Sequence, residues 1–260
     1  MKLTVLTENT VSDAALTPEH GVSFYIETSC HKILFDMGQS DLFVRHAEKL
    51  GIDLSQVDVA VLSHGHYDHG GGLSAFLQIN DHAPIYVSEH AFAPHFRGDG
   101  TDIGLQPSLM TEPRLRFVGE QLALDGELEL FACNRRPRPF GTDTAGLCMA
   151  GMRPEDFCHE QYLLIRERGK RVLVSGCSHK GILNIAEWFA PDVLVGGLHL
   201  NKQKTEGEGS ETLAQIAMQL QRYPTRYYTC HCTGLPQYYY LKERMGEQIL
   251  YLSAGMSVNI

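Results

Sequence analysis

The chain has 260 residues, of which 43% are hydrophobic and 20% are charged, and its formal net charge is −9. This length suits a single domain with a sizeable core, which we expect to span residues 1–260, and the composition is that of an ordinary globular protein. The acidic balance argues against a nucleic-acid binder or a binder of anionic membranes.

The N-terminal stretch MKLTVLTENT lacks the long apolar core of a signal peptide, and no apolar run is long enough to span a membrane. The seven cysteines are scattered along the chain. An odd number in this setting fits reduced thiols better than a disulfide framework. We therefore expect a soluble, cytoplasmic protein.

The first half of the chain is predicted to form strands and turns with two helices. Period-2 and β-branched runs predict strands, and apolar residues at helical spacing predict helices. The expected strands are 2–8, 22–27, 32–36, 57–62, 84–87, 115–118 and 128–133, and the expected helices are 41–50 and 71–77.

Residues 134–159 are rich in Pro, Gly and Arg and show no clean period, which predicts a long ordered loop. Loops of this length in a compact domain are often functional. The pattern of strands and helices then resumes, with Ser210 as the expected N-cap of the clearest helix. The expected strands are 161–165, 171–175, 191–200, 226–229 and 248–252, and the expected helices are 181–189, 210–223 and 236–245.

Two segments share a layout of apolar strand, serine, histidine-bearing loop, glycine and helix. They are AVLSHGHYDHGGGLSAF and VLVSGCSHKGILNIAEWF. This echo suggests two related halves that meet at one site. The alternative is that any two strand–glycine–helix units look alike.

The stretch SHGHYDHGGG places His64, His66, Asp68 and His69 within six residues, directly after the apolar strand 57–62. Imidazole and carboxylate are good ligands for zinc and reasonable ligands for iron or manganese. The neighbouring glycines allow the backbone to turn sharply enough to aim several side chains at one place. Capping side chains on an exposed turn would not explain three histidines and an aspartate in this order, so the stretch predicts a metal site.

The pattern His-x-His-x-Asp-His after an apolar strand resembles the signature of the metallo-β-lactamase fold superfamily. The segments 33–38, 176–182, 196–200 and 231–234 (ILFDMG, GCSHKGI, GGLHL and HCTG) and His159-Glu160-Gln161 extend the similarity along most of the chain. They resemble a branch usually labelled 7,8-dihydropterin-6-methyl-4-(β-D-ribofuranosyl)aminobenzene-5′-phosphate synthase-like.

This resemblance implies an α/β fold, a four-layer αββα sandwich with a dinuclear site at one edge of its two sheets. It implies two divalent metal ions, zinc first, with iron or manganese as alternatives. The first ion would be held by His64, His66 and a later histidine, which we assign to His179. The second would be held by Asp68, His69 and His231. Asp36 would support the metal loop, which is the stretch from Ser63 to Gly72.

One departure from the family pattern concerns the late aspartate that bridges both ions in most members. The strand that should carry it ends in Cys177, and His199 follows another strand. Either residue could complete a modified site, or water alone could bridge the two ions. Equally, Cys177 could be a small buried side chain and His199 a hydrogen-bond partner of a ligand.

His231 lies between Cys230 and Cys232. Neighbouring strand residues point to opposite faces, so we expect His231 as a ligand and both cysteines as packing residues. The remaining histidines are expected on the surface or in loops: His20, His31, His46, His82, His90 and His95.

A dinuclear site would activate water, with Asp68 orienting it or passing its proton to the leaving group. Arg135, Arg136 and Arg138 could bind phosphate or carboxylate, or could form a solvated basic loop.

Three functions follow: a metal-dependent hydrolase acting on a small anionic ester, phosphodiester or lactone; the dihydropterin-linked synthase activity of the similar branch; or a non-hydrolytic metal-binding or redox module. The expected partner is a small molecule, with no nucleic acid and no membrane.

Overall fold

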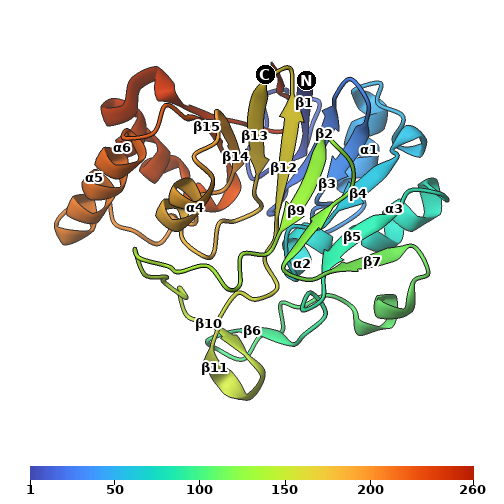
Figure 1. Cartoon of the computed structure of the whole chain (residues 1–260), viewed down its shortest axis with the longest axis horizontal. Helices are drawn as coiled ribbons and strands as arrows, with labels where there is room; N and C mark the ends of the chain where they lie inside the picture. The colour runs from blue at the N-terminus through green and yellow to red at the C-terminus, as the bar shows by residue number, and fades with distance from the viewer.

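The structure is a computed structural model that describes residues 1–260, except for the side chains of residues 208 and 209. Two seven-stranded sheets face each other (Figure 1). The first has the order β17 (Ser257–Asn259), β1 (Lys2–Thr7), β2 (Ser23–Glu27), β3 (Lys32–Phe35), β4 (Val59–Val61), β5 (Ile85–Ser88) and β7 (Leu115–Val118). The second has the order β16 (Ile249–Tyr251), β15 (Arg226–Thr229), β14 (Val193–Gly196), β13 (Lys170–Val174), β12 (Tyr162–Glu167), β9 (Leu128–Phe131) and β8 (Gln121–Ala123).

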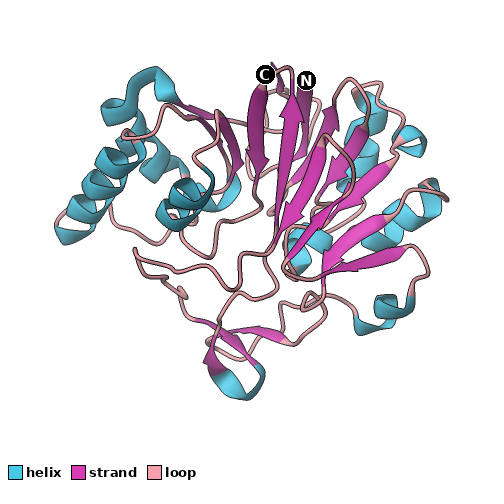
Figure 2. Cartoon of the chain, viewed as in Figure 1, coloured by secondary structure: helices cyan, strands magenta, loops and turns pink.

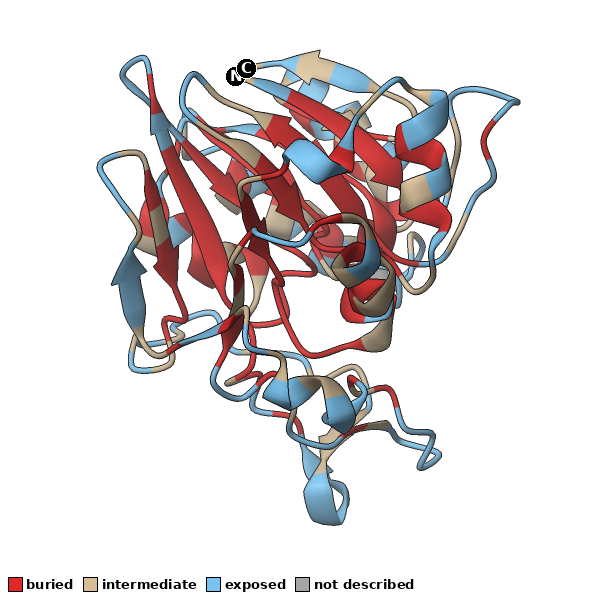
Figure 3. Cartoon of the chain, turned by 90° about the vertical axis from the view of Figure 1, so that its right-hand side faces the viewer, coloured by how far each residue is buried: buried red, intermediate tan, exposed pale blue. Residues whose placement is uncertain are grey.

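The central strands are buried on both faces, as the red strands of Figure 3 show. In β13, Val172 and Val174 face the other sheet, whereas Leu173 faces the outer helices. In β4, Val59 and Val61 likewise pack between the sheets, and Ala60 packs outward. This alternation explains why near-continuous apolar runs form the strands: each strand fills two apolar layers.

Helices cover the two outer faces (Figure 2). On the first sheet lie α1 (Leu42–Lys49) and α3 (Leu73–Ile79), through Phe43, Ala47, Leu73 and Phe76. On the second lie α4 (Ile182–Phe189), α5 (Glu208–Leu220) and α6 (Leu235–Met245), through Ile185, Phe189, Leu213 and Leu241. The expected four-layer αββα sandwich is thus confirmed.

Two predictions about local structure were wrong. The segment 134–159 is not all loop: β10 (Leu147–Met149) and β11 (Arg153–Pro154) pair with β6 (His95–Arg97) in a small third sheet. Strands this short show no period, and their partner lies far away in the sequence. Ser210 is not the N-cap of α5, because Gly207 takes that position and the Ser210 hydroxyl donates to the Gly207 carbonyl.

Strands β3, β4 and β5 run parallel in the first sheet, and β13 to β16 run parallel in the second. The carboxyl ends of parallel strands share one edge of a sheet, where loops are free to carry function. Among the residues that the structure describes, no helix is long and apolar enough to cross a bilayer.

Candidate metal centre

The predicted ligands follow the carboxyl ends of parallel strands. Asp36 follows β3, the metal loop follows β4, Cys177 follows β13, His199 follows β14 and His231 follows β15. The metal loop continues into the short helix α2 (Tyr67–Gly70). A Cβ on Gly65 would lie 2.1 Å from the Ala91 carbonyl oxygen, so only glycine fits this turn of the loop.

The structure brings together the six residues predicted to bind metal. His64 Nε2 lies 3.3 Å from His179 Nε2, although the two residues are 115 positions apart. His231 Nε2 lies 3.3 Å from Asp68 Oδ2, and His69 Nε2 lies 3.8 Å from the same oxygen. All six are buried: His64, His66, Asp68, His69, His179 and His231. Their roles as ligands remain predictions.

Hydrogen bonds fix the tautomers of two of these histidines through Asp36. Asp36 Oδ2 lies 2.7 Å from His69 Nδ1, so that nitrogen carries the proton and Nε2 keeps its lone pair. The Ser63 hydroxyl also donates to Asp36 Oδ2, at 2.7 Å. Because the hydroxyl proton of Ser63 already points to Asp36, Ser63 Oγ can only accept from His64 Nδ1, at 2.8 Å. His64 therefore carries its proton on Nδ1, and its Nε2 keeps the lone pair as well.

Asn9 fixes the tautomer of His231 in the same way. Asn9 Oδ1 accepts from the Gly21 amide and lies 2.8 Å from His231 Nδ1, which therefore donates. His231 Nε2 then faces Asp68 with a lone pair. The backbone of His231 is left-handed, with φ of 49°, and its amide donates to Glu8 Oε1 at 2.5 Å. Both contacts hold the ring in this orientation.

Lone pairs therefore converge on a space lined by imidazole nitrogens and the Asp68 carboxylate. Burial alone would raise the pKa of Asp68, but the neighbouring imidazoles of His69, His20 and His231 outweigh burial and hold it well below its usual range. Buried atoms that can only accept repel one another unless a cation lies among them. The donor set of imidazoles and one carboxylate fits a divalent transition metal such as zinc.

Two positions for an ion can be distinguished. The first lies among His64, His66 and His179, whose donor atoms, one from each residue, are all within 4.8 Å of one another. The second position is at Asp68 Oδ2, beside His69 and His231. Cys177, which stands where a bridging aspartate was expected, places its sulfur 3.1 Å from His69 Nε2. His199 packs against the His179 ring at 4.3 Å, and both its ring nitrogens lack a hydrogen-bond partner among the described residues.

His20 lies in an exposed loop, as expected, and it also reaches the centre. Its Nε2 lies 3.3 Å from Asp68 Oδ2. The Asn9 amide nitrogen lies 3.5 Å from His20 Nδ1 and can only donate, so His20 carries its proton on Nε2. His20 is therefore a hydrogen-bond donor to Asp68, not a metal ligand. No local pattern in the sequence marks it.

His95 was also expected on the surface, and this expectation was wrong: it is 2% exposed, since β6 packs it against Glu155. His95 and His159 each place a donor atom within 4.8 Å of His66. However, His159 Nδ1 accepts the Gly65 amide at 2.9 Å, so its Nε2 carries a proton and cannot bind a metal in the neutral ring. His46 is buried too, with its Nδ1 2.7 Å from the Leu6 carbonyl.

The expectation that His231 and its neighbouring cysteines face different sides was wrong for Cys232. Residues 231–233 form a 3-10 turn and not a strand, so the alternation of side chains does not apply. One donor atom each from Cys177, His231 and Cys232 lie within 4.8 Å of one another. Cys230 packs in the core between the sheets, as expected.

The centre opens into a cleft of about 310 Å³ lined by His66, Asp68, Cys177, His179, His199 and His231. The described cations that line it are Arg97 from β6 and Lys202 from the loop after β14. Arg135, Arg136 and Arg138 do not line it. Arg136 packs over the Phe131 and Phe189 rings, and Arg138 donates to the Asp156 carbonyl.

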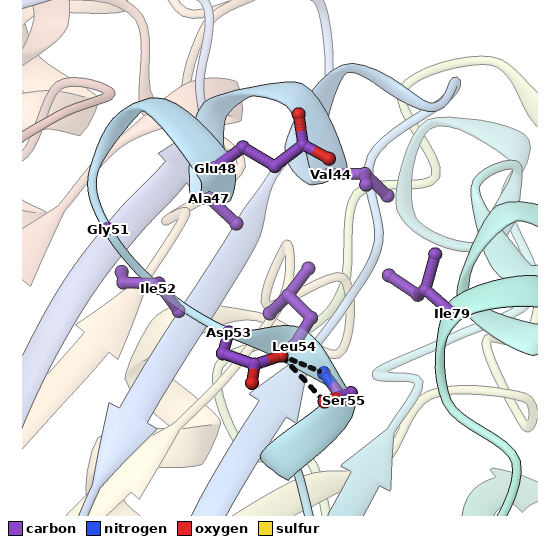
Figure 4. Close-up of a pocket in the computed structure, with 9 residues that line it drawn as sticks. All are labelled: Val44, Ala47, Glu48, Gly51, Ile52, Asp53, Leu54, Ser55 and Ile79. Carbon is purple, nitrogen blue, oxygen red and sulfur yellow. Dashed lines mark hydrogen bonds between the residues drawn. The ribbon is translucent and has the colours of Figure 1, made fainter.

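A separate hollow lies between α1 and α3, on the outer side of the first sheet (Figure 4). The residues that line it are Val44, Ala47, Glu48, Gly51, Ile52, Asp53, Leu54, Ser55 and Ile79. It contains no histidine or cysteine, and Asp53 is occupied by the Ser55 amide and hydroxyl. We therefore place the chemistry in the histidine-lined cleft.

Comparisons with known proteins agree with this assignment. The model of the metallo-beta-lactamase superfamily matches residues 16–144. A solved structure described as a metal-dependent hydrolase of the beta-lactamase superfamily superposes with a TM-score of 0.81, at 27% identity, over 100% of this chain and 99% of that one.

Two proteins of Methanocaldococcus jannaschii are also similar. An uncharacterized protein is 28% identical, over 83% of this chain and 84% of its own. A 7,8-dihydropterin-6-methyl-4-(β-D-ribofuranosyl)-aminobenzene-5′-phosphate synthase is 26% identical, over 91% of this chain and 88% of its own.

Proposed function

This chain is a protein of the metallo-β-lactamase fold, and we propose that it is a metal-dependent hydrolase that acts on a small anionic ester, phosphodiester or lactone at a dinuclear centre. The observation that carries the proposal is the convergence of lone pairs from His64, His69, His231 and Asp68 at the end of an open cleft. Two divalent ions held by these residues would supply Lewis-acid activation of a water and would stabilise charge on the attacking and leaving oxygens.

The protein's own residues supply orientation and proton handling. Asp36 and Asn9 hold three imidazole rings in the tautomer that exposes Nε2. Asp68 is ionised at neutral pH and lines the cleft, so it can accept a hydrogen bond from an attacking water. His20 donates to Asp68 and is half-exposed, which places a proton carrier between Asp68 and solvent.

Arg97 and Lys202 support an anionic substrate. They line the cleft from two different segments of the chain. Arg97 Nη2 lies 3.3 Å from the Tyr67 hydroxyl, and Lys202 Nζ donates to the Ala145 carbonyl. On a chain with a net charge of −9, two cations beside the reaction site would attract and orient an anion. We therefore assign to them the role that was expected of Arg135, Arg136 and Arg138.

A second candidate is the dihydropterin-linked synthase activity named for the 26% identical relative. The similarity spans nearly the whole of both chains, which favours this candidate over a more distant branch. It predicts that a reduced pterin raises the melting temperature of the protein. No shift with a panel of pterins would leave the hydrolase as the only proposal.

The hydrolase is tested by turnover of bis-p-nitrophenyl phosphate and of a lactone panel by the zinc- or manganese-loaded protein. We expect turnover that a chelator abolishes and that metal restores. Asp68→Asn should lose at least about 100-fold in kcat, since general acid–base catalysis contributes about 10²–10⁴-fold. Asp41→Asn, at the exposed N-cap position of α1, is the matched control and should keep full activity. A metal-loaded wild type that turns over no member of the panel would contradict the proposal.

A further inference from the structure

We propose that Cys177 and Cys232 are metal ligands, with the Cys177 thiolate bridging the two positions and the Cys232 thiolate bound at the second. The inference rests on the proposed metal centre and extends it. It replaces the bridging aspartate, which this sequence lacks, by a pair of sulfurs.

Cys177 is central among the donor atoms. It takes part in three separate sets of side chains whose donor atoms lie within 4.8 Å of one another. They are His64 with His69, His179 with His199, and His231 with Cys232. The first set reaches into both metal positions, because His64 belongs to the first and His69 to the second. A single sulfur beside both positions is placed where a bridging ligand must be.

Cys232 reaches the second position through local backbone geometry. His231 has a left-handed backbone and begins a 3-10 turn, and together these bring the Cys232 side chain to the same side as the His231 ring. A Cβ on Gly197 would lie 2.3 Å from Cys232 Sγ, so glycine is required opposite this sulfur. The thiol is close enough to the Cys177 carbonyl for a weak hydrogen bond, at 3.4 Å. These features hold the sulfur in the cleft.

The surroundings of these two cysteines differ from those of ordinary buried thiols. Cys133 and Cys230 belong to the apolar clusters on either face of the second sheet. Cys177 and Cys232 line the cleft instead, among several imidazoles and the Asp68 carboxylate. A small apolar side chain is poorly stabilised in such a polar setting, whereas a thiolate there would be stabilised by binding a metal ion.

Negative charge at the centre points the same way. Two thiolates would add negative charge beside the Asp36 and Asp68 carboxylates, which contact His69, and this charge would lower the cost of burying two divalent ions. Each thiol would release its proton to solvent when the metal binds, and sulfur would favour zinc, cadmium or cobalt over manganese.

The experiment loads metal-free protein with Co²⁺ in the absence of oxygen and records the near-ultraviolet charge-transfer band of Co²⁺–thiolate bonds. We expect this band in the wild type. Cys232→Ser should lose part of it and weaken one of two bound ions, whereas Cys177→Ser should weaken both ions. Cys230→Ser is the matched control, because it changes the other neighbour of His231, and it should leave spectrum and stoichiometry unchanged.

Zinc X-ray absorption on the wild type gives a test that needs no variant. The inference requires sulfur at about 2.3 Å from zinc. Bound zinc with only nitrogen and oxygen neighbours, or a charge-transfer band that survives both substitutions, overturns the inference and leaves the proposed hydrolase standing. Failure of the wild type to bind any metal overturns both.

Discussion

Asp36 Oδ2 lies 2.7 Å from His69 Nδ1, with both side chains fully buried. The same oxygen accepts from the Ser63 hydroxyl, which in turn accepts from His64. One carboxylate therefore sets the tautomer of two predicted ligands, one in each metal position. Asp36 itself has a left-handed backbone, with φ of 57°, which is costly for a residue other than glycine and directs its side chain into the centre.

Replacement of Asp36 should weaken metal binding without removing a ligand. Asp36 accepts three hydrogen bonds, from the Ser63 amide, the Ser63 hydroxyl and His69 Nδ1. The side-chain amide in Asp36→Asn cannot accept all three, so at least one ring loses its orientation. Loss of such a supporting group typically costs about 10–100-fold in metal affinity. Competition with a chromogenic chelator measures this loss, and Asp41→Asn is the control. Unchanged affinity in Asp36→Asn would show that the tautomers are set by other contacts.

His179 and His159 differ in which nitrogen is free, and this difference predicts opposite results. His179 places Nε2 3.3 Å from His64 Nε2, and its Nδ1 has no described partner. His159 accepts the Gly65 amide through Nδ1, so its Nε2 is protonated. We expect His179→Gln to lose about one bound ion per chain and His159→Gln to lose none, as measured by elemental analysis after gel filtration. If His159→Gln loses an ion and His179→Gln does not, the first metal position lies closer to His95 than we infer.

The metal loop could be predicted from the sequence because its four polar residues are neighbours in the chain. His179 and His231 followed from the family resemblance, and β13 and β15 deliver both to the same edge as the loop. Cys232 could not be predicted, because the alternation rule assumes a strand and residues 231–233 form a 3-10 turn.

The substrate side of the cleft was harder to predict for a related reason. Arg135, Arg136 and Arg138 are close in sequence, yet none of them lines the cleft, and the Arg136 and Arg138 side chains donate to the Trp188 and Asp156 carbonyls. Arg97 and Lys202 are far apart in sequence, yet both line the cleft. β6 carries Arg97 and His95, and it forms only by pairing with β10. A strand of three residues with a distant partner leaves no periodic signal.

Arg97 and Lys202 should affect the binding of charged substrates only. Arg97→Met or Lys202→Met should raise KM for an anionic ester about 10-fold or more, since a hydrogen bond to a charged group contributes about 1.5–3 kcal/mol. KM for an uncharged lactone should stay the same. Arg136→Met is the control: it should leave both KM values unchanged and lower the free energy of unfolding by about 1 kcal/mol, through loss of its packing on Phe131 and Phe189. An equal rise in KM for both substrates would exclude charge recognition.

His31 gives a pH-dependent prediction away from the metal centre. Its Nε2 lies 2.7 Å from Asp125 Oδ2 and its Nδ1 lies 3.3 Å from Asp58 Oδ1, which joins the turns of the two sheets. Burial lowers the pKa of His31, but the hydrogen bonds and charges of Asp125 and Asp58 outweigh burial and raise it. The folded state therefore binds the proton more tightly than the unfolded state. This stabilisation is complete below the pKa of an unfolded histidine, about 6.5, and is lost as the pH rises through the higher folded value.

The free energy of unfolding lost in His31→Asn should accordingly be larger at pH 5.5 than at pH 8.5. The difference should not exceed about 1 kcal/mol, because both partners are partly exposed to solvent. Urea denaturation of wild type and variant at both pH values, at one fixed metal concentration, measures it. His82→Asn is the control, since the pair of His82 with Asp81 is far more exposed and should show no such dependence. A loss in His31→Asn that grows with pH would mean that the neutral ring, rather than the ion pair, stabilises the contact between the sheets.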